Sequence, residues 1–144
     1  MNIEIININK ENVVLIGGNQ YLGYRGRFEC PLVSGEAVIV PYSGREEKLA
    51  VGNVISVETD QETVSDFKVE TAEVEPMIEA LSTPGDYKVR GIVVLNSDNV
   101  VFDIEVGNFS FAVDNKDTGN LIPKVGDLVS FNIHGLSLWD ENTL

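Results

Sequence analysis

The chain has 144 residues, 43% of them hydrophobic and 23% charged, and its 23 acidic side chains against 10 basic ones give a net charge of −13. This length and balance fit one domain or two very small ones, and they exclude a chain that is disordered throughout, collagen-like or of low complexity. The negative charge argues against non-specific binding to nucleic acids or anionic lipids, because both need basic contacts.

The first predicted element is a β-hairpin. Apolar residues within 3–8 and 13–16 flank a polar connection at residues 9–12, and Gly17-Gly18-Asn19 ends the second run. Residues 21–30 then show two different faces at alternating positions, as a β-strand does. The N-terminal segment is therefore expected to be antiparallel sheet.

Further strands follow after turns rich in proline, serine and glycine. An apolar run at residues 37–40 ends at Pro41, and a strand is expected at about residues 48–58, with a bend or bulge at Gly52. Five short strands in about 58 residues predict a small meander or barrel.

The middle of the chain is acidic. Eight acids and one base fall between Glu58 and Glu79. Alternation at residues 64–75 predicts an exposed strand, residues 76–81 could form one helical turn, and Ser82-Thr83-Pro84-Gly85 is the best linker candidate. Residues 61–85 are therefore expected to be an acidic strand and linker.

Four strands are predicted in the second half, at residues 87–95, 100–106, 109–113 and 128–134. Gly107-Asn108 suits a tight hairpin, and residues 114–123 form a loop or a short helix. Leu136, Leu138 and Trp139 make a last apolar piece, which predicts that the C-terminal segment is docked.

One short pattern occurs twice. Residues 35–40 and 126–131 both read Gly, acid, apolar, Val, any residue, apolar. We expect each glycine to take a turn conformation and each acid to face solvent where a strand begins. A shared functional loop is the alternative, and six residues do not establish an internal duplication.

Residues 87–139 combine three meandering strands, a gap for a short helix, and a strand that opens with Val125-Gly126-Asp127-Leu128-Val129. This segment resembles a small OB-type barrel at the level of the fold. The resemblance implies binding of oligonucleotides, oligosaccharides or proteins on one sheet face. Strand binding by such folds uses aromatic platforms in basic grooves, whereas four basic residues fall in this segment, so nucleic acid is not expected.

The predicted fold is all-β, with two small antiparallel β-barrel or meander subdomains packed together. Residues 1–60 form the first, 61–85 the acidic strand and linker, and 86–144 the OB-like second. Neither subdomain could bury much core alone, because units of about 60–70 residues are marginal. The groove between them is the expected binding site.

Catalysis is not expected. His134 is the one histidine, and nucleophilic catalysis would need it beside an orienting carboxylate and one of Ser137, Ser130 or Cys30. The sequence also lacks the Gly-x-Ser-x-Gly motif that presents a nucleophilic serine on a sharp turn. We interpret His134 as structural. One histidine and one cysteine also cannot supply the usual zinc shell, so no cofactor or metal is expected.

The acids and glycines allow other readings. Asp103 and Glu105 share a strand face and could bind a cation or raise one another's pKa, but a solvated strand face explains them more simply. Residues 114–119 resemble a calcium loop, except that Lys116 takes an oxygen position and no closing Glu follows. The glycine-rich residues 17–23 lack a Walker lysine and predict a turn.

The preferred function is a non-enzymatic binding or regulatory protein that presents an acidic surface to a basic protein partner, as immunity or inhibitor proteins do, by analogy alone. Such a surface steers association and rejects wrong partners. The candidate contact residues are Glu58, Asp60, Glu62, Asp66, Glu70 and Glu73.

The alternative is an OB-like ligand-binding module for an oligonucleotide or an oligosaccharide. Tyr21, Arg25 and Arg27 share one strand face and could grip a carboxylate or phosphate. These arginines could instead pair with the protein's own acids. No signal-peptide or membrane-spanning pattern is present in the sequence, so the expected compartment is the cytoplasm and no membrane partner is expected.

Overall fold

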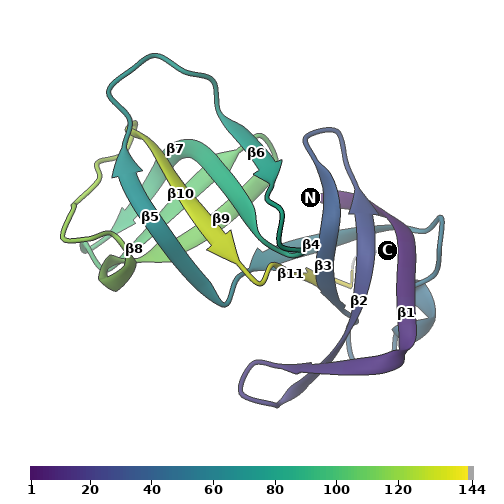
Figure 1. Cartoon of the computed structure of the whole chain (residues 1–144). Coiled ribbons are helices and arrows are strands. Elements are labelled where there is room, and N and C mark those ends of the chain that lie inside the picture. The colour runs from purple at the N-terminus through teal and green to yellow at the C-terminus, as the bar shows by residue number, and fades with distance from the viewer. Residues whose placement is uncertain (143–144) are drawn as a thin grey trace.

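The computed structural model describes residues 1–142, and strands dominate it (Figure 1). One sheet contains β1 (Asn2–Ile16), β2 (Tyr21–Glu29), β3 (Ser34–Val40), β4 (Val54–Asp60) and β11 (Ser137–Asp140). The other contains β5 (Thr63–Val69), β6 (Met77–Ala80), β7 (Tyr87–Ser97), β8 (Val101–Val106), β9 (Phe109–Asp114) and β10 (Leu128–His134). Two short 3-10 turns of the described chain are η1 (Glu46–Lys48) and η2 (Asn115–Asp117).

The first sheet is a closed barrel in the order β1-β2-β3-β11-β4. The second is a curled sheet in the order β5-β10-β7-β8-β9, with β6 paired to β7. Figure 1 shows the two units side by side, joined by chain segments that cross between them. The predicted all-β class, with two small barrel-like units packed together, is confirmed.

The two units exchange strands. After β4 the chain leaves the barrel, and β5 pairs with β10 of the second sheet. After β10 the chain returns, and β11 lies between β3, to which it is parallel, and β4, to which it is antiparallel. Each unit therefore contains a strand that follows directly from the other unit.

Both exchanges use the same register. Thr63, the first residue of β5, faces His134, the last residue of β10. In the other unit Ser137, the first residue of β11, faces Asp60, the last residue of β4. The two crossing segments thus continue one antiparallel register from one sheet into the other.

The turns before β4 and β10 are also equivalent. Gly52, with φ of 88°, donates its N–H to the carbonyl of Ile5 at 2.8 Å, and Gly126, with φ of 96°, donates to Val93 at 2.8 Å. In each case the acceptor residue donates back to the residue after the glycine, at 2.9 Å. Positive φ explains the glycine at both positions. The two halves therefore repeat one strand–turn–strand construction.

The six-residue pattern that occurs twice in the sequence does not mark equivalent segments, and the expected turn conformation is absent at Gly35. Gly126 precedes β10, but Gly35 lies within β3, a strand with a different place in its sheet. Gly35 does not have positive φ. A side chain there would overlap the hydroxyl of Tyr87, so close approach of the second unit requires this glycine. The counterpart of Gly126 is Gly52.

The N-terminal prediction was wrong in one respect. Residues 3–16 do not form a hairpin but the single strand β1, whose pairing with β2 is irregular between Ile8 and Val13. The polar residues stay extended across this irregularity, and Val13 pairs with Tyr24. The chain reverses at the next turn, where Gly17, Gly18 and Asn19 all have positive φ.

Two further elements differ from prediction. Residues 76–81 contain strand β6 in place of a helical turn, because their backbone pairs with β7. Residues 48–58 are not one strand, since η1 and the turn at Gly52 come before β4 begins. The secondary structure of these two segments therefore depends on strand pairing and on the positive φ at Gly52 more than on the local pattern of apolar residues.

The predicted division at residues 60 and 86 differs from the strand pairing. β5 and β6, which fall in the predicted acidic strand and linker, are strands of the second sheet, while β11, assigned to the second unit, closes the first. Alternation shows that a segment is a strand, but not which sheet receives it. The last two residues of the predicted range 86–144 lie outside the described residues.

Buried side chains of both sheets belong to one apolar cluster. Tyr87 at the start of β7 is buried, donates its hydroxyl to the Glu36 carbonyl at 2.6 Å, and lies 6.3 Å from the ring of Phe28. Burial raises the pKa of its phenol above the ordinary value. Buried Leu136 accepts from Val38 at 3.1 Å and donates to Gly85 at 2.9 Å. These contacts join the units.

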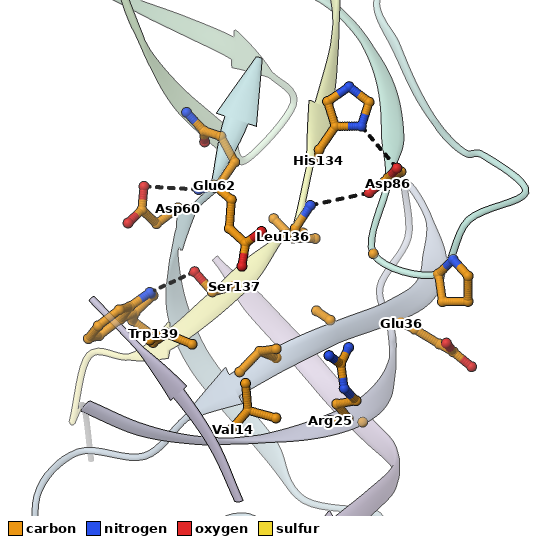
Figure 2. A pocket seen from close by; sticks show the side chains of 18 of the residues that line it. Val14, Arg25, Glu36, Asp60, Glu62, Asp86, His134, Leu136, Ser137 and Trp139 are labelled. Carbon is orange, nitrogen blue, oxygen red and sulfur yellow. Dashed lines mark hydrogen bonds and ion pairs between the residues drawn. The ribbon is translucent and has the colours of Figure 1, made fainter. Parts of the chain in front are cut away.

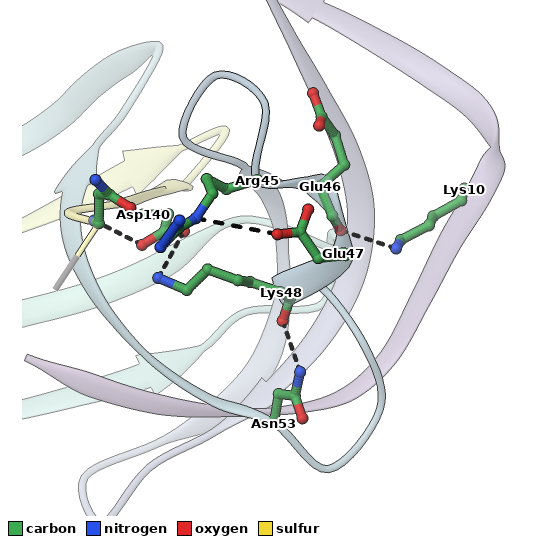
Figure 3. A network of polar contacts seen from close by, with 8 residues as sticks. Lys10, Arg45, Glu46, Glu47, Lys48, Asn53 and Asp140 are labelled. Carbon is green, nitrogen blue, oxygen red and sulfur yellow. Dashed lines mark hydrogen bonds and ion pairs between the residues drawn. The ribbon is translucent and has the colours of Figure 1, made fainter. Parts of the chain in front are cut away.

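A polar network fixes β11 in the barrel (Figure 3). Asp140 has no exposed side-chain surface, and its carboxylate lies 3.5 Å from the ammonium of Lys48 in η1. The Lys48 carbonyl accepts from the Asn53 amide at 3.0 Å, and the Glu46 carbonyl accepts from Lys10 at 3.0 Å. The loop between β3 and β4 is thereby tied to the returning strand.

Candidate functional site

A groove of about 950 Å³ lies where the chain crosses between the two units (Figure 2). One wall consists of the β1–β2 loop and the faces of β2 and β3. The other wall consists of residues 60–62, residues 84–86 and the crossing from β10 into β11. The groove therefore owes its shape to the strand exchange. It lies where the sequence predicted a binding site, between the units.

Two arginines line the barrel wall. Arg25 and Arg27 alternate along β2 and both reach the groove. Figure 2 shows the Arg25 guanidinium pointing into it. Within residues 1–142 neither makes an ion pair, and Arg27 makes one long hydrogen bond to the Ser34 hydroxyl at 3.4 Å. The prediction that they pair with the protein's own acids is therefore wrong.

Acidic side chains approach from the opposite wall. Figure 2 shows Glu62 extending into the groove from the β4–β5 crossing. Its carboxyl group lies against Gly135, where an added Cβ would be 2.7 Å from the carboxyl carbon. Asp60 accepts the Gln61 N–H at 2.9 Å. In the described chain these two carboxylates have no ion-pair partner, so both are available to a ligand.

An aromatic pair lies beside the groove, and Trp139 is the member that lines it. Trp139 of β11 lines it and donates its indole N–H to Ser137 at 2.9 Å. Tyr21 packs edge-on against Trp139, with ring centroids 4.9 Å apart and planes at 76°. Of the predicted strip of Tyr21, Arg25 and Arg27, the two arginines line the groove and the tyrosine contacts it only through Trp139.

His134 lines the groove and forms a hydrogen bond through each ring nitrogen. Its Nδ1 is 2.9 Å from Asp86 Oδ2, and its Nε2 is 2.8 Å from the Ser65 hydroxyl. The second Asp86 oxygen accepts the Gly135 N–H at 3.2 Å. None of the serines or the cysteine considered in the sequence is its partner. Ser65 was missed because β5 reaches β10 only through the strand exchange.

Two of the six predicted acidic contact residues lie in the groove. Asp60 and Glu62 line the groove, whereas Glu58 and Glu73 are exposed elsewhere. Asp66 accepts from the Asn132 amide at 3.1 Å.

Glu70 is engaged within its own unit. It accepts from the Ser130 hydroxyl at 2.7 Å and lies 3.6 Å from Lys68. The hydrogen bond from Ser130 is the main cause that lowers the pKa of this carboxyl. Glu70 is therefore a structural residue of the second sheet.

No protein-family model, no curated protein and no solved structure matches this chain. Residues 1–142 contain no cluster of three or more His, Cys, Asp or Glu side chains suited to a metal ion. The same residues contain no helix with the length and apolar character needed to cross a membrane. The chemistry of the groove is therefore argued from its own residues.

Proposed function

We propose that this protein is a binding protein and that the groove between its units accepts a segment of a basic protein partner. The observation that carries this proposal is that the two arginines and the carboxylates of Asp60 and Glu62, on the two walls of the groove, make no ion pairs within the described chain. Arginines on β2 line one wall and carboxylates on the crossing segments line the other, and the groove is large enough for several side chains. Such groups gain charge-assisted hydrogen bonds only when a ligand arrives.

The balance of charge favours a basic partner. Four carboxylates and two guanidinium groups line the groove, and the whole chain carries a net charge of −13. A field of this sign speeds encounter with cationic surfaces and penalises anionic ones. Arg25 and Arg27 would then hold a carboxylate of the partner and fix the register of the bound segment.

Peptide titration tests this proposal. A peptide of alternating Lys and Glu serves as the probe in calorimetry at low salt, with an all-Glu peptide for comparison. We expect binding of the mixed peptide that weakens with salt, and a loss of about tenfold in affinity in the D60N/E62Q double variant, which corresponds to about 1.4 kcal/mol.

The matched control is D98N/E105Q, which removes the same charge at exposed positions outside the groove. We expect it to bind nearly as the native chain does. Equal weakening by both double variants would mean that general charge, not the groove, binds the peptide. Absence of binding at low salt would remove the main support for a basic partner.

A second candidate is an OB-type site for an oligosaccharide. The groove lies on the β2–β3 face of a five-stranded barrel, between the β1–β2 loop and the segment after β4. OB folds bind ligands at these places. This support comes from the first barrel, not from residues 87–139. Carboxylates beside Trp139 suit sugar hydroxyls better than phosphates.

Trp139 fluorescence tests the second candidate. Neutral oligosaccharides should change the emission of Trp139 and compete with one another, whereas short single-stranded DNA should not. If only the Lys-Glu peptide changes the emission, the saccharide candidate fails and the protein-partner proposal gains support.

A further inference from the structure

A second cluster of reactive side chains lies on the second sheet, at the edge of the groove. Ser65 comes from β5, His134 from the end of β10, and Asp86 from the residue before β7. The serine hydroxyl lies 2.8 Å from His134 Nε2, and His134 Nδ1 lies 2.9 Å from Asp86. We propose that Ser65 is a nucleophile for the hydrolysis of small carboxylic esters, with His134 as its general base.

The hydrogen bonds give each group a defined role. Asp86 accepts from Nδ1–H, which leaves Nε2 free to accept the proton of the Ser65 hydroxyl. The other oxygen of Asp86 accepts the Gly135 N–H at 3.2 Å, so the carboxylate is held in place from two sides. A nucleophile bonded to a base that a third group orients is the general arrangement of serine hydrolases. Asp86 is a positioning residue.

The backbone at Ser65 is unusual for a strand. Asp66, the next residue, has φ of 55°, and the pairing of β5 with β10 shifts between Ser65 and Lys68. A positive φ at a non-glycine residue is uncommon and costs free energy, and β-bulges often redirect side chains beside active sites. This irregularity follows directly after the residue whose hydroxyl meets His134.

The cluster is partly open to solvent, and Ser65 itself is half-buried. The His134 side chain is 36% exposed and that of Asp86 is 18% exposed. Figure 2 shows the His134 ring bonded to Asp86, and both residues line the groove. His134 and Asp86 thus share the groove with Arg25 and Glu62, while Ser65 lies behind them on β5. Because the cluster is partly open to water, we expect esters with good leaving groups as substrates, not amides.

The reaction balances with water as the co-substrate. Ser65 Oγ attacks the ester carbonyl carbon and passes its proton to His134 Nε2. The tetrahedral intermediate then breaks its bond to the leaving alkoxide, which takes that proton from His134. Water next attacks the acyl group on Ser65 and gives a proton to His134, which returns it to the serine oxygen. The products are a carboxylic acid and an alcohol.

Covalent labelling of the full chain tests the nucleophile. The probe is an alkyl fluorophosphonate, followed by intact mass and peptide mapping. We expect one adduct, on Ser65, that is absent in S65A and forms about 100-fold more slowly in H134Q, the range expected for loss of a general base. S97A, an exposed serine outside the cluster, should label as the native chain does. Hydrolysis of p-nitrophenyl acetate should follow the same order.

A purely structural network would give different results. D86N should keep its thermal unfolding transition and Trp139 fluorescence near native values, yet lower the labelling rate, because the histidine loses the carboxylate that orients its ring. D86E should restore part of that rate. The proposal is overturned if folded native protein gives no adduct at Ser65 while a known serine hydrolase labels in parallel. It is also overturned if folded H134Q labels as fast as the native chain.

Discussion

The two exchanged strands start in the same register but end in different environments. β11 is bordered by β3 and β4, and three of its four residues are buried. β5 pairs with β10 at one edge of the second sheet, and none of its residues is fully buried. One construction therefore gives a closed barrel in the first unit and an open curled sheet in the second.

This comparison shows what closes a barrel. A barrel closes when the exchanged strand pairs with strands on both of its sides. β11 does so, because it pairs with β4 and, in parallel, with β3, whereas within the described chain β5 pairs with β10 alone. A strand with neighbours on both sides buries its apolar side chains, while an edge strand keeps one side open. The first unit should therefore depend on its borrowed strand more than the second does.

The largest expected effect compares Leu138 with Val64, the second residues of β11 and β5. Leu138 is fully buried and Val64 is partly buried. Leu138→Ala should lower the free energy of unfolding by about 3 kcal/mol and Val64→Ala by about 1 kcal/mol, since the cost follows the buried volume lost. Urea unfolding followed by Trp139 fluorescence and far-ultraviolet circular dichroism measures both. Equal losses would contradict the stated difference between the strands.

Two lysine–carboxylate pairs sharpen the comparison. Asp140 is fully buried beside Lys48, whereas Lys68, which pairs with Glu70, is 62% exposed. Lys48→Met should cost about 2 kcal/mol, because it leaves a buried carboxylate without its partner. Lys68→Met should change stability by about 0.5 kcal/mol or less, as exposed pairs do. Thermal unfolding of both variants measures the two losses of stability. A larger loss for Lys68→Met would contradict the expectation that the Lys48–Asp140 pair contributes more.

The joint between the units gives a smaller effect. Tyr87→Phe removes the hydroxyl that donates to Glu36 and leaves the ring in place. We expect a loss of about 1 kcal/mol, the net value of one hydrogen bond. Tyr42→Phe, at an exposed tyrosine, is the control and should be neutral. Denaturant titration measures the free energy of unfolding of both variants, and equal values would contradict a role for the Tyr87 hydroxyl.

The smallest effect is a change in acid stability. The pKa of Glu70 is lower in the folded chain, so its contribution is complete above the ordinary carboxyl pKa and disappears as the pH falls through the lowered value. Glu70→Gln should flatten the loss of stability on the acid side and leave the curve near neutral pH almost parallel to that of the native chain. Melting temperatures across pH 2–7 test this. An unchanged acid limb would exclude a role for the Ser130 hydrogen bond.

The sequence predicted strands better than it predicted their partners. Residues 128–134 were predicted with the observed bounds, because a turn glycine and clear alternation mark them. Alternation contains no information on which sheet receives a strand, so β5 was predicted without a sheet and β11 was assigned to the wrong unit. The useful signal was the likeness of Gly52-Asn53-Val54 to Gly126-Asp127-Leu128, which shows that β4 and β10 are equivalent.

The candidate sites show the same limit. Arg25 and Arg27 could be selected from sequence, because they share a strand face beside an aromatic residue. The contact of Ser65 with His134 could not, because it joins positions 69 residues apart that meet only through the exchange. A short sequence motif can identify a site only when its residues lie in one segment, and the residues of this cluster come from three separate segments.

The position of β11 has a consequence for synthesis of the chain. As the polypeptide leaves the ribosome, β1 to β4 emerge first, but their barrel retains an open seam until residues 137–140 have been translated. The N-terminal half cannot complete its fold during elongation and must keep its apolar strands accessible meanwhile. Nascent chains of this kind depend on late, long-range pairing, which slows folding and favours protection by chaperones.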